Sequence, residues 1–318
     1  MQGDTPLSVS AHGVRPEDRD LRHHLRYGFV IVDKPRGPTS HQVSAWVRNM
    51  FGAVKAGHSG TLDPNVSGVL PIALDDAAKA LNVLLLGTKE YIGILKLHGQ
   101  VQRGDVDEVF GEFTGPIYQI PPVRAAVKRE RRVREIFQLE LLEMNGRDVL
   151  FRVECESGTY IRTLCKDIGD ALSVGGHMLE LRRTRSGHFG EEQACKLHQL
   201  KDALAHLQET GDEAEVRRLV LPFERMLDAL PKVFIKDSAV DAVCHGANVA
   251  VPGIMKVEGK FTRGDTVAVL THKDEAVAIG EAKADSMVLL GKQKGNAINL
   301  KRVLMPPGTY PKLWKRGK

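Results

Sequence analysis

One acid, Asp63, lies in the glycine-rich stretch "HSGTLDPNVSGVLPIA" (residues 58–73). No second carboxylate and no spaced set of metal ligands accompanies it. The stretch lacks the lysine of a phosphate-binding P-loop, the G-x-G-x-x-G of a dinucleotide site and the G-x-S-x-G of a serine hydrolase. A lone carboxylate can act as a nucleophile if an arginine keeps it ionised in a dry site. The residues alone leave open which arginine, and an ordinary turn-forming aspartate before proline is the common alternative.

The flanking sequence predicts the elements that hold this stretch. Residues 27–37 are typical of a strand that ends at a Pro/Gly turn, and a helix behind a Thr39/Ser40 cap follows to Phe51. A second helix is expected over 76–86, closed by Gly87, and a strand over 89–99. Together they place the acid between a helix and strands.

A hairpin is expected around Asn145-Gly146. Alternating apolar residues mark its two strands: Phe137, Leu139 and Leu141 before the turn, and Val149, Phe151, Val153 and Cys155 after it. A helix begins after Gly158-Thr159 and has one apolar face, formed by Ile161, Leu164, Ile168 and Ala171. Arg162, near its start, points away from that face.

The remaining third of the chain predicts helices around 196–207 and 215–230 and then a boundary at Pro231. Beyond it, an Asp237-capped helix stopped by Gly246 and three short strands indicate a small β-rich domain. The expected fold class is α+β: a mixed, largely antiparallel sheet domain followed by a small β-rich domain.

Composition limits the class of protein. A chain of 318 residues with 42% hydrophobic residues can form two domains, and no apolar run approaches a membrane span. The N-terminus lacks the apolar core of a secretion signal, so we expect a cytoplasmic protein. Four cysteines without a C-x-x-C pair argue against a zinc site and for buried thiols.

Basic residues cluster in "PPVRAAVKRERRVR" (residues 121–134) and in the C-terminal "PKLWKRGK". Such clusters suit a phosphate backbone, although a solvated charged loop is an equal alternative for the first. The connection over 115–132 is long for a turn, and long connections in compact domains are usually functional. We therefore interpret it as a binding flap.

Four segments resemble the TruB-type pseudouridine synthases: "FVIVDKPRGPTS", "HSGTLDPNVSGVLP", "KEYIG" and "CESGTYIRTLCKDIG". Three others resemble the archaeal, dyskerin-like branch of that family, the catalytic subunits of box H/ACA guide-RNA complexes: "IPPVRAAVKRERRVREIF", "MLELRRTRSGHFGE" and the segment from Cys244 to Lys283. The last of these is similar to a PUA domain. The resemblance covers nearly the whole chain.

The resemblance implies roles for individual residues. Asp63 would be the nucleophile, Arg162 its partner, and Tyr91 the aromatic that stacks on the target base and can move a proton. Three substrate-binding residues are implied as well: His58 holds the uridine out of its helix, Leu181 lines the pocket, and Lys34 with Pro35 supports the site. Without the motif, each of these residues would be assigned to packing or capping.

RNA-binding residues are implied in two regions. They are Arg124, Lys128, Arg129 and Arg131 of the thumb-like loop, and Gly246 and Gly253 of the PUA-like segment. The implied domains are an N-terminal extension (1–26) packed on the PUA domain, a catalytic domain (27–230) with the thumb-like loop at 115–132, a PUA domain (231–307) and a basic tail (308–318). A mobile charged tail is the alternative for the extension.

The function implied is isomerisation of uridines to pseudouridine in rRNA, and in tRNA as a further substrate, with neither metal nor organic cofactor. Partners implied are guide and substrate RNA, a small zinc-ribbon protein, a small glycine/arginine-rich protein, and a kink-turn-binding ribosomal-type protein joined through the RNA. Two alternatives stay open: a guide-independent tRNA T-loop synthase and a non-catalytic RNA-binding scaffold.

Overall fold

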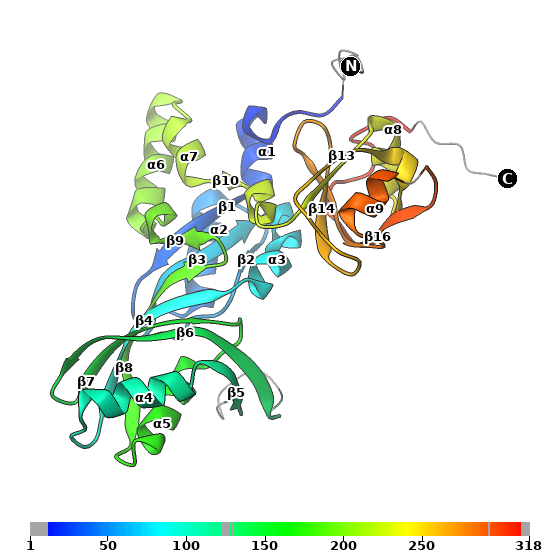
Figure 1. Cartoon of the computed structure of the whole chain (residues 1–318). Coiled ribbons are helices and arrows are strands. Elements are labelled where there is room, and N and C mark those ends of the chain that lie inside the picture. Colours follow the sequence, from blue (N-terminus) through cyan, green and yellow to red (C-terminus); the bar gives the residue numbers. More distant parts are fainter. Residues whose placement is uncertain (1–11, 122–127, 129, 292, 313–318) are drawn as a thin grey trace, which may run out of the picture. The chain divides into compact units, whose positions relative to one another are not determined.

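The computed structural model describes residues 12–121, 128, 130–291 and 293–312, which divide into two compact units (Figure 1). One unit is Phe29–Val220, and the other joins Met1–Gly28 to Leu221–Lys318. The first contains the Asp63 stretch. Each unit has its own core of buried apolar residues.

Strands of the Phe29–Val220 unit form one sheet in the order β1-β3-β8-β4-β7-β6-β5, with β2 beside β3 and β9 beside β8. β3 pairs in parallel with β8. The pairs β8–β4, β4–β7, β7–β6 and β6–β5 are antiparallel. Their bounds are β1 Gly28–Lys34, β2 Ala56–His58, β3 Ser67–Leu74, β4 Lys89–Leu97, β5 Gly115–Gln119, β6 Arg132–Asn145, β7 Asp148–Cys155, β8 Gly176–Ser186 and β9 Phe189–Gly190.

Helices of this unit cover the sheet. Figure 1 shows α4 and α5 on one face of the β4-β7-β6 region. The α-helices are α2 Ser40–Phe51, α3 Leu81–Leu86, α4 Arg103–Glu112, α5 Ile161–Ala171, α6 Leu197–Thr210 and α7 Ala214–Leu219, and short 3₁₀ turns are η2 Asp75–Lys79 and η3 Glu191–Gln193. The mixed, largely antiparallel α+β fold class is confirmed.

The expected helix behind Thr39 is confirmed as α2. The Thr39 hydroxyl accepts from the backbone N–H of Gln42, the Gln42 side chain accepts from the Thr39 N–H, and Gly52 ends the helix in the left-handed region at φ 62°. This capping box and glycine stop fix both ends of the helix that lies beside the Asp63 stretch.

The expected hairpin is β6 and β7, but its details differ. Asn145 pairs with Asp148, so the two-residue turn is Gly146-Arg147, one residue later than expected. Phe137 is exposed and Ile136 is buried, because the pairing register shifts between Ile136 and Gln138. A bulge of this kind moves every residue beyond it to the opposite face, which simple alternation cannot reveal.

Four other expectations are wrong in part. Residues 76–86 form η2 and then α3, because a tighter 3₁₀ turn begins the helix. The helix expected over 215–230 ends at Leu219, before Pro222, and resumes only as the 3₁₀ turn η4 Phe223–Leu227. In the flap, Gly115–Gln119 is a strand, and Ala171 of α5 is exposed.

The other unit contains the β-rich domain expected after Pro231, with strand order β12-β16-β15-β14-β11-β13. The strands of this sheet are β11 Lys232–Ile235, β12 Val249–Ala250, β13 Ile254–Glu258, β14 Thr266–Leu270, β15 Ala276–Ala282 and β16 Asn296–Val303. The short strand β10 Leu221–Pro222 precedes Pro231 and is not part of this sheet. Its helices are η1 Pro16–Asp18, α1 Leu21–Arg26, α8 Asp237–Cys244, η5 Val251–Gly253 and α9 Ser286–Gly291. β14, β15 and β16 confirm the three expected strands.

Three features of this unit depart from the sequence interpretation. His24 is the buried residue of α1, whereas Leu21 and Leu25 are only half-buried. Tyr310 is 1% exposed and belongs to the core, so packing continues past residue 307. Asp237 is the first residue of α8, and its carboxylate contacts the His272 ring at 3.1 Å.

All four cysteines are free and buried, as expected. Burial raises the pKa of the Cys195 thiol to about 11 and that of Cys155 to about 12, so these thiols stay protonated. Within the described ranges, no helix is long and apolar enough to cross a membrane, and no group of three or more His, Cys, Asp or Glu could hold a metal ion.

Gly68 is required where β3 and β8 meet. Its φ is 105°, and a Cβ there would lie 2.1 Å from the Arg183 carbonyl oxygen. We predict that Gly68→Ala lowers the free energy of unfolding by about 2 kcal/mol, from backbone strain and the forced separation of the strands. Denaturant titration measures this loss. Gly104→Ala in α4, which meets nothing within 4 Å, is the control and should instead gain about 0.5–1 kcal/mol.

Candidate active site

The Asp63 stretch forms a tight turn held from beneath by Lys34. The N–H of Val66 donates to the Asp63 carbonyl at 3.0 Å, which closes the turn. The Lys34 ammonium donates to the carbonyls of Pro35 at 2.9 Å, Pro64 at 3.2 Å and Val66 at 2.8 Å. Lys34 is 0% exposed, and burial lowers its pKa. Because its ammonium is enclosed by protein carbonyls, Lys34 supports the turn rather than contacting substrate.

Ser40, the first residue of α2, fixes the residue before Asp63. Its hydroxyl donates to the Leu62 carbonyl at 3.0 Å and accepts from the Leu62 N–H at 2.8 Å. The side chains of Leu62 and Val66 are buried in the core of the unit. The backbone on both sides of Asp63 is therefore anchored, and only the acidic side chain projects.

Asp63 and Arg162 are brought together as an ion pair across 99 residues of sequence, with the Arg162 guanidinium donating to the Asp63 carboxylate. Arg162 is the second residue of α5, and its neighbours Ile161 and Leu164 are buried while it projects outward. The side chains are 51% and 49% exposed. The pair is thus assembled as expected, but the turn is open to solvent rather than dry.

Tyr91 and Leu181 lie on the adjacent strands β4 and β8. Tyr91 is 8% exposed, and burial raises its pKa even though the nearby Arg183 guanidinium opposes the shift, so the phenol stays neutral. Leu181 shares the core cluster of Tyr91 and lines a pocket of about 180 Å³ with Ser67 and Gly93. That volume is below the roughly 300–1,000 Å³ usual for ligand pockets.

His58 ends β2, five residues before Asp63. Its ring lies 4.9 Å from the His41 ring, and neither of its buried ring nitrogens has a hydrogen-bond partner among the described residues. Burial, followed by repulsion from His41, lowers the pKa of His58, which favours the neutral imidazole. A neutral ring with unused polar atoms can accept a hydrogen bond from a ligand.

Sequence reasoning missed Arg183, a buried cation on β8. Its guanidinium is 1% exposed and donates to the carbonyls of Val69 at 2.8 Å, Gly60 at 3.0 Å and Ser59 at 3.4 Å. It ties the stretch before Asp63 to the sheet beside Tyr91. The available signal was the alternation in "LRRTRS", which places Arg183 on the same buried face as Leu181.

Lys89 is a second buried cation, and we predict a pH-dependent stability from it. Burial, with repulsion from Arg183, lowers its pKa from 10.5 to about 8, while its ammonium donates to the carbonyls of Leu84 and Gly87. Between pH 8 and 10.5 the unfolded chain binds the extra proton, so the Lys89 contribution to stability increases with pH, by at most about 3 kcal/mol.

The measurement is denaturant unfolding from pH 7 to 10.5 for the chain and for Lys89→Met. Thiol ionisation acts oppositely in both, because the buried cysteines have raised pKa values. The difference between the two proteins therefore isolates the lysine. Parallel pH profiles would refute a lowered pKa at Lys89.

The residues proposed to bind RNA lie apart from the Asp63 turn in sequence. Arg124 and Arg129 lie outside the described residues. Lys128 pairs with Glu130, and the Arg131 guanidinium lies 4.8 Å from the centre of the Tyr118 ring. Gly246 and Gly253 belong to the other unit, in the turns after α8 and before β13. A Cβ at Gly246 would meet nothing within 4 Å.

Family comparisons match most of the chain. Residues 48–161 match the TruB family pseudouridylate synthase (N terminal domain) and 162–228 the tRNA pseudouridylate synthase B C-terminal domain. Residues 231–304 match the PUA domain and 4–44 the DKCLD (NUC011) domain. Among relatives, a probable tRNA pseudouridine synthase B of Methanopyrus kandleri is 53% identical over 95% of this chain and 90% of its own.

Another relative of the same name, from Archaeoglobus fulgidus, is 50% identical over 98% of this chain and 96% of its own. The crystal structure of a Cbf5-Nop10-Gar1 complex contains a chain 49% identical, with TM-score 0.90, covering 97% of this chain and 94% of that one. An H/ACA RNP bound to a substrate RNA containing 2'-deoxyuridine matches at 48% identity, TM-score 0.89, and 98% and 96% coverage. The chain therefore belongs to the TruB family of pseudouridylate synthases and has the PUA and DKCLD domains.

Proposed function

We propose that the chain isomerises specific uridines to pseudouridine in rRNA as the catalytic subunit of a box H/ACA ribonucleoprotein. Asp63 is the nucleophile, and the observation that carries this assignment is its ion pair with Arg162 on an anchored turn. A guanidinium beside a carboxylate favours the ionised, nucleophilic form and orients it. The same carboxylate is half exposed and so can be reached by a nucleotide of an incoming RNA.

Isomerisation breaks the N1–C1′ bond, rotates the uracil and rejoins it through C5, so no net oxidation or hydrolysis takes place. We propose that Tyr91 provides the aromatic surface for the uracil and that His58 and Leu181 hold it in place. Unstacking the target from RNA costs about a few kcal/mol, which such contacts offset. Since Tyr91 is only 8% exposed, stacking of a base on its ring requires the surrounding residues to move.

For the domains we propose an extension (1–26), a catalytic domain (27–230) with the 115–132 loop closing on RNA, and a PUA domain from 231. The core of the PUA domain extends past residue 307 to include Tyr310, and the basic tail follows. Contacts support packing of the extension on the PUA domain. The Val14 N–H donates to Glu275 at 3.1 Å, and the Lys273 ammonium donates to the Gly13 carbonyl at 2.8 Å. Arg19 also forms a bidentate ion pair, at 2.6 and 3.0 Å, with Glu224, which precedes the PUA domain in the chain. Exposed Gly246 and half-buried Gly253 are then the RNA contacts of the PUA domain.

The proposed partners follow the solved relatives, whose complexes contain Nop10, Gar1 and a substrate RNA. We propose that this chain binds a small zinc-ribbon protein, a small glycine/arginine-rich protein and, through guide RNA, a kink-turn-binding protein. The relatives are archaeal, and we propose a cytoplasmic location in an archaeal cell.

We predict that uridine isomerisation in an rRNA fragment requires a matched guide. Base pairing with the guide selects the target, because proteins read paired RNA mainly by shape. The measurement is pseudouridine formation with a matched guide, a mismatched guide and no guide, each with and without the partner proteins. Equal turnover in all three guide conditions would contradict a guided enzyme.

A guide-independent tRNA synthase remains a second candidate, because the relatives are named probable tRNA pseudouridine synthases. Unmodified tRNA offered to the chain alone distinguishes the two: robust T-loop isomerisation without guide or partners would make this the primary activity. An RNA-binding scaffold would instead form the complex and isomerise no uridine with either substrate.

A further inference from the structure

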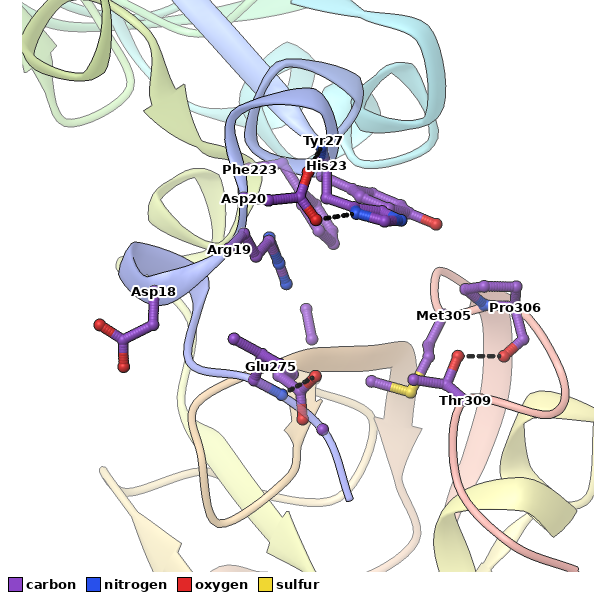
Figure 2. Close-up of a pocket in the computed structure, with 13 residues that line it drawn as sticks. Asp18, Arg19, Asp20, His23, Tyr27, Phe223, Glu275, Met305, Pro306 and Thr309 are labelled. Carbon is purple, nitrogen blue, oxygen red and sulfur yellow. Dashed lines mark hydrogen bonds and ion pairs between the residues drawn. The ribbon is translucent and has the colours of Figure 1, made fainter. Parts of the chain in front are cut away.

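A pocket of about 530 Å³ lies in the unit formed by the N-terminal extension and the β-rich domain. Figure 2 shows Tyr27, Phe223 and His23 on one side and Glu275, Met305 and Thr309 on the other, with Arg19 between them. The residues that line this pocket include neither the Asp63 turn nor any residue proposed above to bind RNA. Its volume falls within the usual range for a ligand site.

The pocket is amphipathic. Phe223, Ala276 and Met305 are buried and form an apolar floor, and Tyr27 adds an aromatic wall. At the rim, the hydrogen bond from His23 lowers the pKa of Asp20, so its carboxylate is ionised. An apolar floor beneath an acidic rim matches a ligand with an aromatic ring next to cationic groups.

The walls are held rigidly. Arg19 forms its bidentate ion pair with the buried Glu224, and its guanidinium lies 5.3 Å from the centre of the Tyr27 ring. Glu275 accepts from the Tyr310 hydroxyl at 2.5 Å, from the Thr271 hydroxyl at 3.1 Å and from the Val14 N–H. Because these groups are already paired within the protein, the pocket exists before any ligand binds.

We propose that this pocket binds the chain's own C-terminal segment, residues 313–318 ("LWKRGK"), with the Trp314 ring on the apolar floor and the adjacent cations at the Asp20 rim. The described chain ends at Lys312, three residues after Thr309, which lines the pocket. An extended chain spans up to about 3.6 Å per residue, so the five residues from Thr309 to Trp314 reach about 18 Å at most.

Charge distinguishes this occupant from the other terminal segment near the pocket. Residues 1–11 contain one acid and no lysine or arginine, and they have no aromatic side chain. Residues 313–318 contain Trp314 with Lys315, Arg316 and Lys318. Only the second segment complements both an apolar floor and an acidic rim.

The fluorescence of Trp314 can be used to test this proposal. The chain has two tryptophans, and Trp46→Phe leaves Trp314 as the remaining one. In the full-length Trp46→Phe chain, we expect blue-shifted emission and weaker acrylamide quenching than in the synthetic hexapeptide 313–318. These values should not change on dilution. Emission identical to that of the free peptide would overturn the proposal, and a shift lost on dilution would assign the pocket to the tail of a second copy instead.

A truncated chain that ends at Lys312 tests whether the pocket is the binding site for residues 313–318. The hexapeptide should bind it with increased fluorescence anisotropy, and replacing the peptide tryptophan by alanine should weaken binding roughly tenfold or more, through loss of aromatic burial. Asp20→Asn, which keeps the helix cap, should weaken binding about two- to fivefold. Glu258→Gln, an exposed acid of the same unit outside the pocket, is the matched control. Equal effects of Asp20→Asn and Glu258→Gln, or equal binding of hexalysine, would overturn the proposal.

Discussion

Asp63→Asn is expected to lower kcat for uridine isomerisation by about 10⁴-fold or more in the reconstituted guide complex. An amide cannot replace the carboxylate as nucleophile, and losses of this size follow removal of a nucleophile from other enzymes. Folding should be nearly unaffected, because both Asp63 and Arg162 are half exposed and an exposed ion pair contributes about 0–1 kcal/mol. Single-turnover assays with saturating guide complex measure the chemical step.

The matched control is Asp170→Asn, which removes a carboxylate from the exposed Lys166–Asp170 pair of α5, the helix that carries Arg162. It should leave both kcat and the free energy of unfolding nearly unchanged. Guide and substrate RNA binding should be similar in the two variants. If Asp63→Asn retained full isomerisation, the nucleophile would have to be another group and the proposed chemistry would fail.

The two exposed residues of this site, Asp63 and Arg162, were identified from the sequence. The resemblance of "HSGTLDPNVSGVLP" and "GTYIR" to the family implied that Arg162 is the partner of Asp63, and the structure pairs them across 99 residues. Local patterns also located α2 behind its Thr39 cap, the β6–β7 hairpin and β14 to β16, since each depends on near neighbours in the chain.

The residues that hold the turn were predicted only in part. The resemblance implied Lys34 as a support, whereas the contacts of Arg183 depend on which backbone carbonyls converge in space. In the sequence, Arg183 is one of several arginines in a basic strand. In the structure it is buried and its guanidinium donates to the carbonyls of Ser59, Gly60 and Val69. The bulge at Ile136 depends on β7 rather than on β6, so alternation misassigned Phe137. His24 is buried on α1 although the leucines beside it are more apolar.

Lys34→Met is expected to lower both stability and turnover. The three carbonyls of Pro35, Pro64 and Val66 would lose their shared donor, and a buried acceptor left without a partner costs about 1–3 kcal/mol. Relief of the buried charge offsets part of that cost, so we expect a net loss of about 3 kcal/mol in the free energy of unfolding. Thermal and denaturant unfolding measure it.

The effect on kcat tests positioning separately from stability. Lys34 is fully buried and reaches Asp63 only through the turn, so a displaced turn should lower kcat by about 10²-fold while KM for substrate RNA changes little. Assays well below the melting temperature keep the variant folded. Lys166→Met, which breaks the exposed Lys166–Asp170 pair of α5, is the control and should change neither quantity. A raised KM with unchanged kcat would instead indicate that Lys34 contacts the substrate.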